Sequence, residues 1–311
     1  PLRERLIASG DLSASAGVSN TFDTYVEAAV RRFQTRHGLV PDGMVRDETL
    51  VELNVPVEVR IQQLRTNLVR VRAMSADLGD RYVMVNIPAA EVEAVESGIV
   101  ASRHTAVVGR KDRQSPLLTD KIDYVSFNPF WTVPKSIIRK DIIPKMREDP
   151  TYLTRYKIRI LNGKGEEIDP AAVDWNSEEA VDYMLKQDPG DQNSLGQIRI
   201  NFPNEHAVYL HDTPQQTLFG QNARFHSSGC VRVQNVRQLV DWLLEPKGDW
   251  SRMKIDAVVR SGERIDVTLK RSTPIYFAYI TAWSTSDGVV HFRPDIYDRD
   301  GQATPLASTD S

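Results

Sequence analysis

The sequence predicts an α+β fold in which a small N-terminal helical domain precedes a mostly β domain that carries a helical insertion. Apolar residues recur at helical spacing up to Arg72, and after Gly79 the period changes to two. Helix-like segments then interrupt the strand pattern between Lys135 and Asp188. We therefore expect four parts: a helical module at residues 1–55, a connecting helix at 56–75, a β-rich domain at 76–296 with its insertion at about 135–188, and a polar tail at 297–311.

Composition limits the classes of function. The 311 residues are 41% hydrophobic and 26% charged, which is enough for two globular domains. With a net charge of −3 and no basic run with interleaved aromatic residues, we expect no nucleic-acid binding. The single cysteine excludes an internal disulfide, and the six histidines lack metal-binding spacing, so we expect no metal. Neither a signal peptide nor a bilayer-spanning run is present, so a membrane anchor is expected only in residues outside this sequence.

Three helices are predicted before Gly79. The first runs from Thr24 to Gly38, where apolar residues recur at steps of three and four. After a turn at 41–43, Asp47 caps a second helix. The third, from Val59 to Arg72, connects the two domains. The residues expected on the inner faces of the second and third helices are Leu50 and Leu53, then Ile61, Leu64, Leu68 and Val71.

The β-rich domain is predicted from alternation and turn signals. Strands are expected at 82–87, 104–109, 124–128, 197–202, 265–269, 275–282 and 289–292, with a hairpin turn at Asp287-Gly288. An amphipathic helix is expected from Val236 to Leu244. Within the insertion we expect helical segments at 137–143 and 178–185, with a turn at 162–165.

The stretch from Val208 to Val233 is the candidate active site. His211 follows a short buried strand and can move protons near neutral pH. Cys230 follows a Ser-Ser-Gly turn, where Gly229 lets the backbone approach a substrate. A thiol, a base and backbone amides together suit acyl transfer, with the amides of Gly229 and Cys230 as oxyanion donors. The alternative is that Cys230 is a buried apolar filler.

Two ordered motifs in this stretch, His211-Asp212-Thr213-Pro214 and Ser227 to Val233, have Leu218-Phe219 and Arg224 between them. On these residues the chain resembles the L,D-transpeptidases of the YkuD type, and more closely the large periplasmic subgroup that includes the YcbB-like enzymes. The resemblance implies a YkuD-like β-sandwich with the insertion as a lid over the cleft. It also implies Cys230 as nucleophile and His211 as general base and acid, oriented by the main-chain carbonyl of Asp212.

Other residues take expected roles from the same resemblance. Residues 28–53 resemble a small peptidoglycan-binding module, the alternative being a generic helical hairpin. Ser228 stands where the wider family has a histidine, so His226 and His206 are expected to lie outside the site. The alternative role of Trp131 is core packing, and that of Asn193 is a hydrogen bond that shapes a loop. The alternative for the insertion is a structural segment without a lid function. The expected substrate contacts are Tyr209, Ser228, Arg232, Asn193 and Trp131.

The resemblance implies formation of 3→3 peptidoglycan cross-links without ATP, metal or organic cofactor. The acyl donor is a peptide stem whose third residue is meso-diaminopimelate in most Gram-negative walls, and D-alanine is released. We expect carbapenems as covalent inhibitors and the periplasm or cell envelope of a Gram-negative bacterium as the location. Three alternatives stay open: an L,D-carboxypeptidase that uses water, an enzyme that uses a lipoprotein lysine, and a non-catalytic wall-binding protein.

Overall fold

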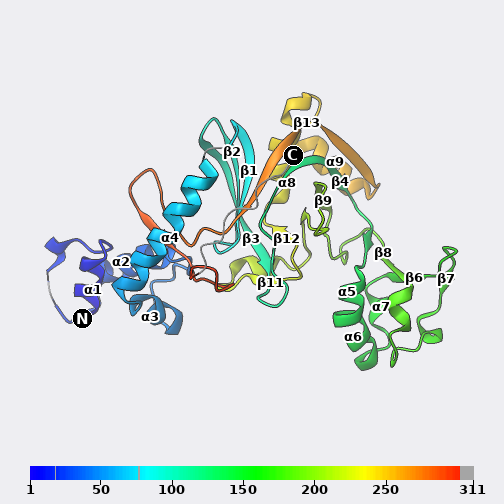
Figure 1. Cartoon of the computed structure of the whole chain (residues 1–311), viewed down its shortest axis with the longest axis horizontal. Helices are drawn as coiled ribbons and strands as arrows, with labels where there is room; N and C mark the ends of the chain where they lie inside the picture. Colours follow the sequence, from blue (N-terminus) through cyan, green and yellow to red (C-terminus); the bar gives the residue numbers. More distant parts are fainter. Residues whose placement is uncertain (18, 76–77, 302–311) are drawn as a thin grey trace.

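The computed structural model describes residues 1–17, 19–75 and 78–301. Figure 1 shows the N-terminal helices at one end, the insertion at the other and the strand domain between them. The α-helices are α1 Leu2–Ala8, α2 Thr24–Arg36, α3 Asp47–Leu53, α4 Val57–Ser75, α5 Lys135–Ile137, α6 Ile143–Glu148, α7 Tyr152–Arg155, α8 Val236–Leu244 and α9 Arg252–Ser261. The strands are β1 Arg81–Asn86, β2 Glu91–Glu96, β3 Ile99–Gly109, β4 Leu118–Phe127, β5 Trp131–Thr132, β6 Ile158–Leu161, β7 Glu167–Ile168, β8 Met184–Gln187, β9 Ile198–Asn201, β10 Leu210–His211, β11 Phe225–Ser227, β12 Val231–Val233, β13 Ile265–Ala278, β14 Ala282–Ser284 and β15 Val290–Phe292.

The N-terminal module packs α1, α2 and α3 around a small apolar core that includes Phe33. The predicted helix from Thr24 is confirmed as α2, and Asp23 caps it by accepting from the Val26 amide at 3.1 Å. The expectation for α3 is wrong in two respects. Asp47 is its first residue and makes no cap bond, and Leu50 is 44% exposed, because only one side of this seven-residue helix faces the module.

Helix α4 turns its polar side inward, so the predicted inner face is wrong. The predicted stripe Ile61, Leu64, Leu68 and Val71 is between 40% and 50% exposed. Buried instead are Gln63, which donates to the carbonyls of Thr281 and Arg293, and Asn67, which donates to the Thr281 hydroxyl. The physical reason is that α4 lies beside β14, where main-chain carbonyls need donors that apolar side chains lack.

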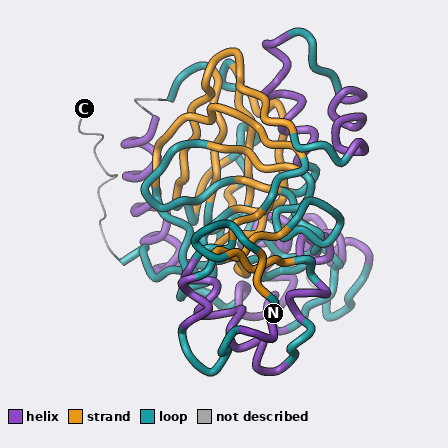
Figure 2. Tube along the Cα trace, turned by 90° about the vertical axis from the view of Figure 1, so that its right-hand side faces the viewer, coloured by secondary structure: helices purple, strands orange, loops and turns teal. Residues whose placement is uncertain are grey.

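The strand domain contains one nine-stranded sheet in the order β11-β3-β12-β10-β9-β4-β13-β1-β2. A further β2–β3 pairing closes this sheet on itself. The expected β-sandwich is therefore formed by one sheet that curls around its core. Figure 2 shows the strands gathered in one body with helices around it. The sequence prediction missed β2 and α9, and the strands expected at 265–269 and 275–282 are largely one 14-residue strand, β13.

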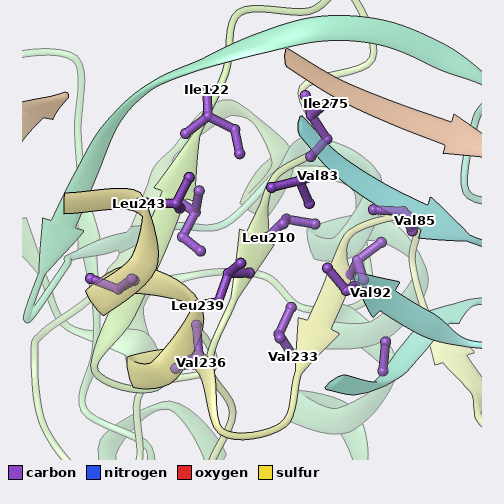
Figure 3. Close-up of a cluster of buried hydrophobic side chains, with 14 of the residues drawn as sticks. Val83, Val85, Val92, Ile122, Leu210, Val233, Val236, Leu239, Leu243 and Ile275 are labelled. Carbon is purple, nitrogen blue, oxygen red and sulfur yellow. The ribbon is translucent and has the colours of Figure 1, made fainter. Parts of the chain in front are cut away.

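The main apolar core lies inside the curled sheet and under α8. Figure 3 shows Val236, Leu239 and Leu243 of α8 among valines and isoleucines of several strands. The bounds of α8 match the predicted amphipathic helix, Val236 to Leu244. This core fixes the strands that carry the candidate site, because Leu210 and Val231 belong to it.

The lid insertion, which we define as residues 135–188, forms a lobe with its own core. The helical segment predicted at 137–143 is confirmed as α5, a π-helical turn at Ile138–Ile142 and the start of α6. The helix predicted at 178–185 is wrong. A short 3₁₀ turn, Glu179–Asp182, precedes β8, which joins the four-stranded sheet β5-β8-β6-β7. Leu185 and Gln187 are buried at alternate positions of β8, which suits a strand, so the lobe is mixed and not purely helical.

The beginning of the expected polar tail is anchored to the domain, which corrects that expectation. Tyr297 is buried and donates to the Gly109 carbonyl at 2.6 Å. Asp300 accepts from Arg70 and Thr281, so burial and hydrogen bonds hold this segment. The rest of the predicted tail, 302–311, lies outside the described residues. In the part of the chain that is described, no helix has the length and apolarity to cross a membrane.

Candidate active site

Three neighbouring strands present a row of polar side chains on one face of the sheet. His211 of β10 lies opposite Arg199 of β9 on one side and Arg232 of β12 on the other. The adjacent row, Ile200, Leu210 and Val231, is buried in the main core. Successive side chains of a strand point to opposite faces, so Arg199, His211 and Arg232 all face away from that core.

The His211 ring is held in one tautomer. Its Nδ1 lies 2.5 Å from the Asp212 carbonyl oxygen, the contact expected from the sequence. A carbonyl can only accept, so Nδ1 carries the proton and Nε2 keeps a free lone pair. The Asp212 carboxylate accepts from the Gln197 amide at 3.0 Å, which fixes this loop. Burial, and then the charge of Arg232, lowers the pKa of His211 to about 3, so the imidazole is neutral.

The Cys230 thiol lies against Tyr209. Both the main-chain N–H and the hydroxyl of Tyr209 interact with the sulfur, and the Val231 amide donates to the Tyr209 carbonyl at 3.1 Å. Burial raises the pKa of the Cys230 thiol to about 11, against the lowering effect of these contacts and of the nearby arginines. The site therefore holds a neutral thiol and a neutral imidazole at rest.

Gly229 shapes the loop before Cys230 but does not offer its amide to the cleft. Its φ of +115° is a conformation that only glycine adopts readily. The Gly229 amide donates to the Ser227 hydroxyl at 3.1 Å, and the Gly229 carbonyl accepts from the Ser115 hydroxyl at 2.7 Å. The expected oxyanion role of the Gly229 amide is thus wrong, because Ser227 already occupies it. The Cys230 amide has no acceptor among the described residues.

Tyr209 joins the site to the core of the lid insertion. Its ring meets the His211 ring edge-on, with centroids 5.6 Å apart. The Trp131 indole donates to the Tyr209 hydroxyl, and both residues pack with the core of the lid insertion. Burial raises the pKa of Tyr209, so the phenol stays protonated. Trp131 is mostly buried, in line with the core-packing alternative.

Ser228 lies at a second junction with the lid insertion. Arg113, from the loop between β3 and β4, donates to the Ser228 hydroxyl at 2.9 Å. The same guanidinium forms a two-bond ion pair with Asp141 of the insertion. One side chain therefore connects the loop of Cys230 to the lobe.

Three residues considered from the sequence do not contribute side chains to this cluster. Asn193 is buried, and its amide donates to the carbonyls of Pro129 and Asp188, so it shapes a loop instead of meeting a substrate. His226 is exposed and bonds Gln221. His206 is exposed beside Glu205.

Comparisons with known proteins identify the family. Residues 80–287 match the model described as the L,D-transpeptidase catalytic domain, of the YkuD type. The chain belongs to the L,D-transpeptidase family. Residues 2–53 match a second model, described as a "putative peptidoglycan binding domain". A curated Haemophilus influenzae protein named "putative L,D-transpeptidase" is 35% identical over 221 residues, which cover 71% of this chain and 45% of the relative. The chain thus spans less than half of that relative's length.

The solved structures that match this chain include two described as L,D-transpeptidases. One, from Xylanimonas cellulosilytica, shares 14% identity at a TM-score of 0.31, and the match covers 89% of this chain and 91% of that chain. The other, LdtMt1 in complex with imipenem, shares 13% identity at a TM-score of 0.29, and the match covers 64% of this chain and 59% of that chain.

Sequence reasoning missed two arginines of this site, Arg199 and Arg113. Arg199 lies in a strand that was predicted, and alternation places it on the face opposite the buried Ile198 and Ile200. The sequence does not show that this strand pairs with β10, which places Arg199 beside His211. Arg113 gave no signal, because its partners Asp141 and Ser228 are 28 and 115 residues away in sequence.

Proposed function

We propose that this L,D-transpeptidase forms 3→3 cross-links between peptidoglycan stems by cysteine acyl transfer. Cys230 attacks the carbonyl of the L-centred third residue of a tetrapeptide stem. The bond to the terminal D-alanine breaks, and the stem remains on sulfur as a thioester. The side-chain amine of a second stem then attacks the thioester and restores the thiol. The observation that carries this proposal is the contact of Tyr209 with the Cys230 thiol beside His211, in a chain of this family.

His211 moves the proton at each step. Nδ1 is engaged by Asp212, so Nε2 takes the thiol proton as sulfur bonds to the carbonyl carbon. The imidazolium then protonates the nitrogen of the departing D-alanine. In the second half, Nε2 takes a proton from the attacking amine and returns it to sulfur. Because the pKa of the thiol is about 11 and that of the imidazole about 3, the first proton transfer accompanies carbon–sulfur bond formation.

Two donors support the oxyanion that forms on the attacked carbonyl. The Cys230 amide has no acceptor among the described residues, and the Tyr209 hydroxyl already touches the sulfur. The Cys230 amide is positioned by the bond from the next residue's amide to the Tyr209 carbonyl, and the Tyr209 hydroxyl is positioned by Trp131. Preorganised donors of this kind lower the barrier by about 2.7–4 kcal/mol each.

The N-terminal module is proposed to hold the enzyme on the wall, which is supported by the family match of residues 2–53. Peptidoglycan lies outside the cytoplasmic membrane, so we place the enzyme in the periplasm or cell envelope of a Gram-negative bacterium. The lid insertion is proposed to cover the bound stem and exclude water, since its core reaches the thiol through Tyr209. Asp141 and Arg113 then fix the lobe beside the Cys230 loop.

Carbapenems test the acyl-transfer proposal, because the strained lactam carbonyl is an acyl donor for the same thiol. Intact-protein mass spectrometry is expected to show one adduct on the wild type and none on Cys230→Ala. A folded wild type that gains no mass after prolonged incubation would contradict the proposal. The same measurement with a soluble tetrapeptide muropeptide in place of the carbapenem tests the natural acyl donor.

A further inference from the structure

We propose that Arg199 and Arg232 form a carboxylate-binding site next to the thiol, and that it holds the free C-terminal carboxylate of the residue released from the acyl donor. The inference rests on the proposed function and names the substrate group that selects the donor. Neither arginine takes part in the proton transfers described above.

The two guanidinium groups flank His211 from both sides. Arg199 and Arg232 occupy the positions paired with His211 on β9 and β12, so all three side chains share the face that carries the thiol. The charges of both arginines reach Cys230, where they oppose the rise of the thiol pKa. Arg199 also lies over the Tyr209 ring, with its guanidinium carbon 5.4 Å from the ring centre.

Neither arginine has a carboxylate partner among the described residues. The Nε atoms of both are buried and lack any hydrogen-bond partner there. Arg232 has one side-chain bond, from Nη1 to the Gln215 amide oxygen at 2.6 Å. By contrast, the largely buried Arg36 pairs with Asp11 and Arg70 pairs with Asp300. Two guanidinium groups without a carboxylate partner thus flank His211.

An uncompensated buried charge is costly, and a carboxylate ligand removes that cost. Burial lowers the pKa of Arg232, which reflects this environment. A guanidinium is a planar fork that matches the two oxygens of a carboxylate, and such bonds are about twice as strong as neutral ones. A bound carboxylate would also cancel the charge of Arg232 that lowers the pKa of His211, so the imidazole becomes a stronger base once the donor is in place.

The geometry selects the C-terminal carboxylate of the released residue. Cys230 and Arg232 are two residues apart, so alternation puts both side chains on the same face, with their Cα atoms about 6–7 Å apart. One residue of extended peptide spans roughly 3.5 Å, which is within the reach of an arginine side chain anchored at that spacing. A carboxylate one residue beyond the attacked carbonyl is therefore within reach of the guanidinium. Stems that end one residue after the scissile bond are accepted, whereas a longer or amidated stem lacks the charge at this point.

A reagent pair tests the site without any peptidoglycan substrate. Cys230 is the only cysteine, so alkylation reports this thiol alone. Iodoacetate carries a carboxylate and iodoacetamide does not. We expect the ratio of their rates to fall about tenfold in Arg232→Gln, equivalent to about 1.4 kcal/mol, and further in Arg199→Gln/Arg232→Gln. Arg232→Lys keeps the charge and is expected to retain part of the ratio.

Arg103→Gln is the matched control, because it removes the same charge from an exposed pair with Glu93. Its ratio should equal that of the wild type, and circular dichroism checks that each variant is folded. An unchanged ratio in folded Arg232→Gln and in the double variant would overturn the proposal.

A second experiment compares two soluble tetrapeptide donors, one with a free C-terminal acid and one with a C-terminal amide. We expect the wild type to form the thioester at least tenfold faster from the acid, and the double variant to lose this preference. Equal rates for both donors in the wild type would refute the carboxylate site while leaving the acyl transfer intact. If neither donor acylates but the iodoacetate preference holds, the proposed function fails and the anion site stands.

Discussion

The ionisation of Cys230 can be measured directly, because the chain has one cysteine. Burial raises the pKa of the thiol from 9.0 to about 11, which is about 3 kcal/mol in favour of the protonated form. At pH 7 about one molecule in 10⁴ then carries the thiolate, about a hundredfold fewer than for an ordinary thiol of pKa 9.0. Because the pKa of His211 is lowered to about 3 while that of the thiol is raised, the resting enzyme lacks a thiolate–imidazolium pair.

The assay is iodoacetamide alkylation between pH 6.5 and 9.5, followed by intact-protein mass spectrometry. We expect the rate to rise about tenfold per pH unit across the range, and to be about a hundredfold below that of the urea-unfolded chain at pH 7. His211→Ala should leave the slope unchanged, and Cys230→Ser is the blank. A rate plateau between pH 6.5 and 8 that vanishes in His211→Ala would refute this reasoning, because it is the signature of a preformed ion pair.

Three further outcomes follow from the structure. Gly229→Ala forces an alanine to a φ of +115° and should lower the free energy of unfolding in urea by about 1–3 kcal/mol. The pKa of buried His37 is lowered to about 2, so its contribution to stability is full above pH 6.5 and declines as pH falls. His37→Phe keeps the ring stacked on Phe33, and its free energy of unfolding should depend less on pH below 6.5 than that of the wild type. Removing residues 1–55 should reduce pelleting with sacculi more than turnover of soluble muropeptides, unless circular dichroism shows the truncated chain unfolded.

The sequence predicted best the elements that local periodicity and motifs specify. The apolar spacing of α8 gave its bounds, and α2 was found from Thr24 onward. The motifs around His211 and Cys230 placed His211 at the end of a strand, with its ring held by the Asp212 carbonyl, and Cys230 on a loop just before the Val-Arg-Val run that is β12. Each of these features depends on residues close in sequence.

Long-range partners decided the features that the sequence missed. The apolar stripe of α4 suggested an inner face, but the neighbouring main chain near Thr281 required amides, so Gln63 and Asn67 turned inward. Residues 178–185 have helical character, yet pairing with β6 makes the second half a strand. The Gly229 amide looked free in sequence, but Ser227 accepts its hydrogen. The periodicity of a segment gives no information about the residues that the segment packs against.

The central claim is that Cys230 transfers a stem to a second stem. The most direct test incubates the purified protein with tetrapeptide muropeptides and analyses the products by mass spectrometry. We predict 3→3 linked dimers together with free D-alanine from the wild type, and neither product from folded Cys230→Ala. Tripeptides without dimers would show that water is the acceptor. Dimer formation by Cys230→Ala at the rate of the wild type would contradict the account.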